Sequence, residues 1–109
     1  MNKISLDFSL LKLNAELFNS KIAEAFFSHL PYEINLTLWG TEAHGSIDID
    51  LGEDNPEPII SAGGLAYTNQ GNYLCIFFGQ RPTWAIEYIG RITWNNWNQL
   101  IGNNKIILL

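Results

Sequence analysis

Glu42 and His44 form the pair of side chains in this sequence best suited to acid–base chemistry. Residues two apart in an extended strand point to the same face, so the carboxyl and imidazole groups would lie side by side. Such a pair can transfer protons when it lies in a concave, partly buried site. The edge of a solvated hairpin is a commoner setting for this spacing. An acid–base enzyme using His44 and Glu42 is therefore an alternative rather than our leading interpretation.

A second pair of acids, Asp48 and Asp50, alternates with Ile47 and Ile49. Paired carboxylates can bind a hard cation or serve acid–base chemistry. The alternation, however, favours a strand over residues 47–51 with one apolar face and one face in water. We therefore interpret the two aspartates as a solvated outer face.

Cys75 is the single cysteine, and it lies within an apolar run, Leu74-Cys75-Ile76-Phe77-Phe78. Burial there would raise the pKa of the thiol and make it a poor nucleophile. The two histidines, His29 and His44, do not cluster with it, so we expect no metal site. The sequence also lacks a nucleophile elbow and a phosphate-binding glycine loop. We expect no cofactor and no catalytic set of a familiar kind.

The charge of the chain argues against two classes of partner. The formal net charge is −5, and the six basic residues are scattered rather than clustered. Binding to a phosphate backbone or to an anionic membrane needs clustered cations. We therefore expect neither nucleic acid nor membrane as a partner. The absence of a long apolar segment predicts no leader peptide and no membrane span, and hence a cytoplasmic protein.

The length of 109 residues predicts a single domain over residues 1–109. Alternating apolar residues predict a first strand over residues 4–13, which bends into a second short strand. Apolar residues at steps of three and four predict an amphipathic helix over residues 15–30, closed by Pro31 and capped by Asn14 or Ser20.

The rest of the chain is predicted to be β-rich. We expect a strand up to Gly40, a surface loop over residues 52–58 and a buried strand over residues 73–78. Further strands are predicted near residues 65–67, 86–94 and 106–109, with one helical turn at residues 96–100. About eight short strands separated by turns favour a sandwich or a closed barrel.

Several segments then show a family resemblance. They are Leu30-Pro31, Trp39-Gly40-Thr41-Glu42, Gly64-Leu65-Ala66-Tyr67, the segment from Gly71 to Gly79, and Ile89-Gly90-Arg91-Ile92. In this order and spacing they resemble the cyclophilin-like family of small prokaryotic proteins. The resemblance implies a mainly β fold, a closed eight-stranded cyclophilin-like β-barrel with one main α-helix over an open end. The family's own activity is unassigned.

The chain departs from the family pattern at two places. Thr68-Asn69-Gln70-Gly71 replaces a turn that resembles Trp-Pro-Pro-Gly in other members, and the segment between Gly79 and Ile89 is short. Both changes would alter the shape of an adjoining groove.

A more distant resemblance, to prolyl isomerases of the cyclophilin fold, suggests a weak or atypical isomerase as a second alternative. Lys21-Ile22-Ala23-Glu24-Ala25-Phe26 is similar to their first helix, and Ile76-Phe77-Phe78 is similar to their buried aromatic strand. Those enzymes need an arginine that stabilises the twisted amide, and the matching stretch, Leu38 to Glu42, contains none. Arg81 is the remaining candidate for a substitute cation, because Arg91 lies within a strand.

The leading interpretation is a non-catalytic binding module. Four Trp, four Tyr and six Phe exceed what a core of this size needs. We expect an aromatic groove that binds a small molecule or an extended peptide. Its expected members are Trp39, Tyr67, Phe77 and Trp84, fringed by Glu42, His44, Asn72 and Arg81. Trp94 and Trp97 either plug the barrel base or, if exposed, form a partner surface that includes self-association into a homo-oligomer.

Overall fold

The computed structural model describes residues 1–8, 12–93 and 105–108, and this part of the chain is mainly β with one helix. Its strands, with the helix α1 at Lys21–Ser28, are β1 Asn2–Asp7, β2 Lys12–Leu17, β3 Tyr32–Asn35, β4 Thr37–Trp39, β5 Glu42–Ser46, β6 Pro56–Glu57, β7 Gly64–Thr68, β8 Tyr73–Phe77, β9 Ile86–Ile92 and β10 Lys105–Leu108. The helical turn predicted at residues 96–100 lies outside the described residues, as do Trp94 and Trp97.

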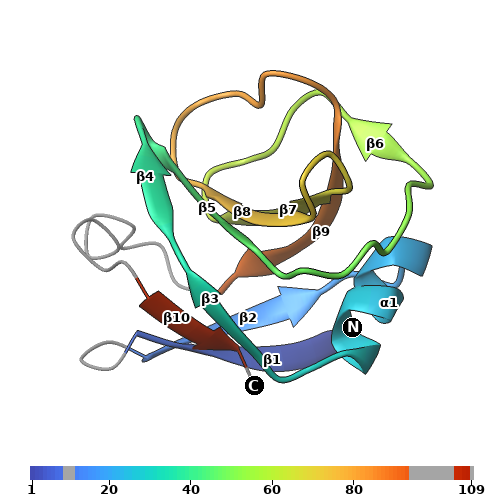
Figure 1. Cartoon of the computed structure of the whole chain (residues 1–109), viewed down its shortest axis with the longest axis vertical. Helices are drawn as coiled ribbons and strands as arrows, with labels where there is room; N and C mark the ends of the chain where they lie inside the picture. The colour runs from blue at the N-terminus through green and yellow to red at the C-terminus, as the bar shows by residue number, and fades with distance from the viewer. Residues whose placement is uncertain (9–11, 94–104, 109) are drawn as a thin grey trace.

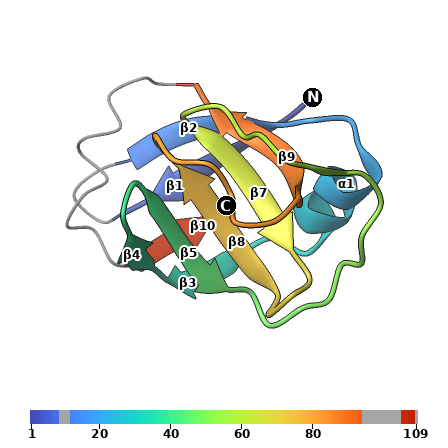
Figure 2. The same cartoon turned by 90° about the horizontal axis from the view of Figure 1, so that it is seen from above.

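The strands form one strongly curved antiparallel sheet in the order β3-β10-β1-β2-β9-β7-β8-β5-β4, with β6 paired to β9 (Figure 1). Seen from above, β5, β8, β7 and β9 lie side by side (Figure 2). The hydrogen-bonded path runs from β3 to β4 and does not join its ends among the described residues. The expected closed eight-stranded barrel is therefore not confirmed, although a mainly β fold with one helix is.

Two strands of the curved sheet touch without a hydrogen-bonded ladder. A Cβ atom added at Gly45 in β5 would overlap the backbone carbonyl oxygen of Asn35 and the side chain of Ile34 in β3. Glycine is therefore needed at this position for close approach rather than for a special backbone conformation. The contact places β5, the neighbour of the end strand β4, against β3 at the other end of the sheet.

The helix is shorter than the predicted range of residues 15–30. It begins after Ser20, whose Oγ accepts a hydrogen bond from the backbone N–H of Ala23. Ala15 and Leu17 belong instead to β2, which pairs with both β1 and β9. Their spacing of two fits a strand as well as a helical stripe, and pairing on both sides decides between them.

The predicted strand over residues 47–51 is wrong. Asp48 has a φ of 59°, a left-handed conformation that ends β5. The segment is held by Tyr67, whose hydroxyl accepts a hydrogen bond from the N–H of Leu51 and lies 2.9 Å from the carbonyl oxygen of Ile49. The alternating isoleucines of this segment therefore pack onto the core from a loop, not from a paired strand.

The central strands are buried on both faces. Leu65 and Tyr67 of β7, with Leu74 and Ile76 of β8, belong to the main core. The opposite face carries a smaller apolar cluster of Ile60, Ala66, Cys75, Phe77 and Ile86. Double-sided burial explains the nearly continuous apolar sequence of β8. Three members of the smaller cluster, Cys75, Phe77 and Ile86, line the candidate site.

Candidate functional site

A pocket of about 120 Å³ lies against the outer face of β5 and β8. The segment of residues 78–85, which links β8 to β9, arches above these strands (Figure 1). The residues that line the pocket are Trp39, Glu42, His44, Thr68, Tyr73, Cys75, Phe77, Pro82, Thr83, Trp84 and Ile86. They come from β4, β5, β7, β8, β9 and the arch (residues 78–85).

The strand register brings the polar and apolar residues of the pocket together. In the ladder between β5 and β8, Glu42 lies opposite Phe77 and His44 lies opposite Cys75. Opposite residues in an antiparallel pair project from the same face. The spacing of two along each strand therefore directs all four side chains towards the pocket.

Glu42 is a nearly buried acid in contact with His44. The Oε2 atom of Glu42 lies 3.1 Å from Nδ1 of His44, and the side chains are 6% and 31% exposed, respectively. The imidazole ring also packs edge-on against Tyr73, with ring centres 5.3 Å apart. The two groups that the sequence suggested as an acid–base pair thus meet in a concave, partly buried site.

Cys75 is buried beside the same carboxylate. Burial raises the pKa of the thiol well above its ordinary value, and the negative charge of Glu42 and a hydrogen bond to it act in the same direction. The thiol therefore remains protonated at neutral pH, in line with the prediction of a buried, unreactive cysteine.

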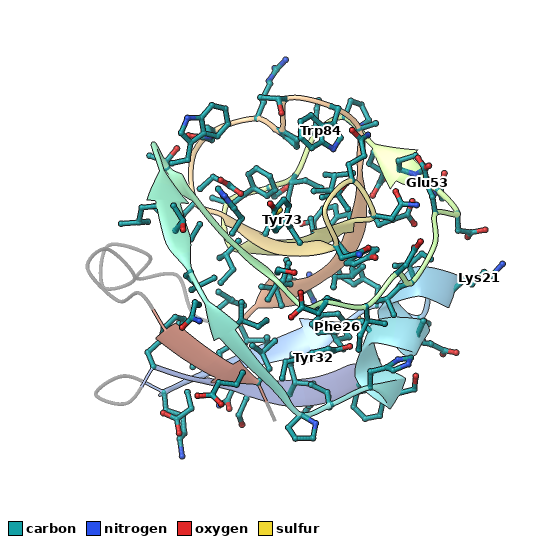
Figure 3. All side chains as sticks on the ribbon, in the orientation of Figure 1. Lys21, Phe26, Tyr32, Glu53, Tyr73 and Trp84 are labelled. Carbon is teal, nitrogen blue, oxygen red and sulfur yellow. The ribbon has the colours of Figure 1, made fainter. Side chains whose placement is uncertain are left out.

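The arch (residues 78–85) is fastened at two points. The backbone N–H of Thr41 donates to Oε1 of Gln80 over 2.7 Å, which ties the arch to the turn between β4 and β5. The indole N–H of Trp84 donates to Oγ1 of Thr68 in β7 over 3.2 Å. Trp84 remains 45% exposed and lies above Tyr73 in Figure 3. The two anchors hold an aromatic wall over the floor of the pocket.

Five of the eight predicted site residues line this pocket, namely Trp39, Glu42, His44, Phe77 and Trp84. Tyr67 projects from the other face of β7 into the main core, where its hydroxyl lies 2.9 Å from Oδ1 of Asn72. Arg81 is exposed on the arch and is not part of the lining. These three residues therefore lie outside the site.

Sequence reasoning missed six lining residues: Thr68, Tyr73, Cys75, Pro82, Thr83 and Ile86. A signal existed for two of them, because Tyr73 and Cys75 share the odd-numbered face of β8 with Phe77. The others depend on how the arch folds back over the sheet, which local spacing does not reveal.

Three other acidic groups have structural partners. Glu87 is 6% exposed, and its carboxylate accepts hydrogen bonds from the backbone N–H groups of Asp54 and Asn55. Asp50 accepts from the N–H of Gly52, and Asp48 accepts from the hydroxyl of Ser46. Within residues 1–8, 12–93 and 105–108, no group of three His, Cys, Asp or Glu side chains could hold a metal ion.

The structure thus defines a small, mainly β fold with an aromatic-lined pocket against its sheet. The sequence matches the family described as Cyclophilin-like over residues 2–106, and the chain belongs to that family. A search of curated protein sequences finds no significant match. In the described residues, no helix is long and apolar enough to cross a membrane.

Two solved structures share the fold. The hypothetical protein AF2241 from Archaeoglobus fulgidus is 22% identical, with a TM-score of 0.74 over 97% of this chain and 92% of that chain. McbB, solved in complex with tryptophan, is 15% identical, with a TM-score of 0.75 over 96% of this chain. The match spans 43% of McbB, so this chain corresponds to less than half of that protein. At these identities the likeness establishes the fold alone.

Proposed function

We propose that this protein binds a small molecule with a flat, apolar body in the pocket beneath the arch (residues 78–85). The main support for this proposal is that one pocket is lined by Trp39, Phe77 and Trp84 together with Glu42 and His44. Apolar walls with a few converging polar groups are typical of ligand sites. Binding of a ligand in this pocket does not require that the protein catalyse a reaction.

The size of the pocket favours a small molecule over an extended peptide. Its volume is about 120 Å³, whereas an engineered apolar cavity of roughly 150 Å³ accommodates benzene. The pocket therefore holds about one ring, with the remainder of a larger ligand passing between the exposed Trp39 and Trp84. The complex of McbB with tryptophan supports testing aromatic small molecules first.

The proposal is tested by titrating isotopically labelled protein with small aromatic compounds and following amide and indole N–H signals by NMR. We expect shifts at β5, β8 and the arch, saturating at millimolar or lower concentration, and a loss of binding in Trp84→Ala. Phe27→Ala is the matched control, because Phe27 is also an exposed aromatic residue but lies on α1. Shifts confined to other surfaces, or equal effects of the two variants, would contradict the proposal.

The geometry gives little support to prolyl isomerase activity. Arg81 is exposed and does not line the pocket. Arg91 in β9 forms an ion pair with Glu16 in β2, with Nη2 of Arg91 3.4 Å from Oε2 of Glu16. We expect no acceleration of cis–trans exchange in proline-containing peptides, measured by exchange spectroscopy. Acceleration that disappears in Arg81→Ala would make isomerisation the better account.

An acid–base enzyme remains the second candidate, because Glu42 and His44 are 3.1 Å apart within the pocket. In such an enzyme, His44 would accept a proton from a carbon atom of the ligand, and solvent would then return a proton to that carbon. In D2O this reaction replaces hydrogen by deuterium at that carbon in a bound ligand. Exchange that is lost in His44→Gln would support catalysis, whereas binding without exchange favours the binding module.

A further inference from the structure

We infer that the pocket selects a small organic cation, a primary ammonium group carried on a single ring or a compact hydrocarbon, with Glu42 as its counter-charge. This inference rests on the proposed function, because it requires a ligand in the pocket beneath the arch (residues 78–85). It adds the charge and the polar group of that ligand.

The charge of the pocket lining favours a cation. Glu42 is nearly buried, and none of the described residues that line the pocket is Lys or Arg. A carboxylate shielded from water interacts strongly with a nearby charge, because the surrounding dielectric constant is low. An anionic ligand would be repelled by this carboxylate, and besides the imidazole of His44 no lining side chain among the described residues could carry a positive charge to balance it. An ammonium group supplies one.

The hydrogen-bonding capacity of the Glu42 carboxylate also favours an ammonium group. An ionised carboxylate offers about four acceptor positions on its two oxygens. Glu42 has two hydrogen-bond partners here. Nδ1 of His44 contacts its Oε2 atom, and the thiol of Cys75 also bonds to the carboxylate. Acceptor positions therefore remain for an ammonium group, which is a donor of three hydrogen bonds and accepts none.

The walls around Glu42 favour a cation that carries a hydrocarbon group. Tyr73, Trp39 and Trp84 line the same pocket as Glu42, and the faces of aromatic rings attract cations. Phe77 and Ile86 supply an apolar floor for the hydrocarbon part of the ligand. The site thus matches an amphipathic cation better than either a hydrocarbon or an inorganic ion.

The test compares three probes of nearly equal shape by calorimetry and NMR: 2-phenylethylamine, 2-phenylethanol and phenylacetate. We expect the amine to bind at least about tenfold more tightly than the alcohol, and phenylacetate to bind most weakly. Glu42→Gln should weaken the amine about tenfold while leaving the alcohol nearly unchanged. Glu24→Gln is the matched control, because Glu24 is an exposed acid on α1, and it should change none of the affinities.

The outcomes separate the inference from the proposed function. If the amine and the alcohol bind the pocket equally in the native protein, the inference of a cation is wrong and the proposed function stands. That comparison needs no variant, so a folding defect in Glu42→Gln would not obscure it. If none of the three probes binds, or if Trp84→Ala binds them as the native protein does, both proposals are wrong.

Discussion

Glu42 and Phe77 lie opposite each other in the antiparallel ladder between β5 and β8, and both line the same pocket. A nearly buried carboxylate therefore stands beside an aromatic floor, with His44 and Cys75 as the next pair along the ladder. Two paired strands alone thus present a charge, a hydrogen-bond donor and an apolar surface. The arch (residues 78–85) then turns this face into a pocket.

Gln80 should influence binding without touching the ligand. Its Oε1 accepts the N–H of Thr41, and it is not part of the lining. Gln80→Ala removes one anchor of the arch and leaves the hydrogen bond from Trp84 to Thr68, so the arch would need to be ordered further on binding. We expect affinity for 2-phenylethylamine to fall roughly three- to tenfold, mainly through faster dissociation. Stopped-flow fluorescence would measure the rates, and unchanged dissociation would show that this contact does not hold the arch.

Cys75 should resist alkylation in the folded protein. Burial, followed by the charge of Glu42 and the hydrogen bond to it, raises the pKa of the thiol, so little thiolate exists at pH 8. Labelling by iodoacetamide at that pH should be at least about tenfold slower than in denaturant. Glu42→Gln should speed labelling only modestly, since burial remains. Fast labelling of the native protein would contradict the buried position.

Ionisation of Tyr32 should lower the free energy of unfolding at high pH. Burial, with a smaller contribution from Tyr67, raises the pKa of Tyr32 from 10.0 to about 12. Between these values the unfolded chain ionises this phenol while the folded chain does not, so the free energy of unfolding falls as pH rises. Below pH 10 the contribution is fully present.

The variant Tyr32→Phe isolates this effect. It loses the hydrogen bond from the hydroxyl to the carbonyl oxygen of Phe26 and, with it, about 1 kcal/mol at pH 8. The stability difference between the native protein and the variant should shrink between pH 10 and pH 12, measured by urea denaturation. A difference that stays constant over this range would show that Tyr32 ionises normally in the folded protein.

Gly45→Ala should destabilise the fold by separating β5 from β3. The added Cβ would overlap the carbonyl oxygen of Asn35, a backbone atom that cannot rotate away. We expect a loss of about 3 kcal/mol. Gly52→Ala is the control, because no atom lies within 4 Å of its added Cβ and its φ of 85° alone should cost about 1 kcal/mol. Equal losses in urea denaturation would mean that β3 and β5 are not in close contact.

The sequence by itself determined the class of fold and several of the residues that line the candidate pocket. Spacing of two predicted the strands, the motifs from Leu30 to Ile92 predicted the cyclophilin-like family, and five pocket residues were named in advance. The sequence predicted Glu42 and His44 on one face, because the alternation of side chains between two faces is a local property of a strand. The apolar neighbours of Cys75 likewise sufficed to predict its burial.

Only the tertiary structure decided which predicted residues share the pocket. Tyr67 and Phe77 belong to neighbouring strands, but the register pairs Tyr67 with Leu74 and Phe77 with Gly64. These pairs lie on opposite faces of the sheet, so Tyr67 enters the core while Phe77 faces the pocket. The turn between β7 and β8 sets that register, and a shift of one residue would exchange the faces. Such a choice depends on contacts across strands, which the pattern along a single strand does not contain.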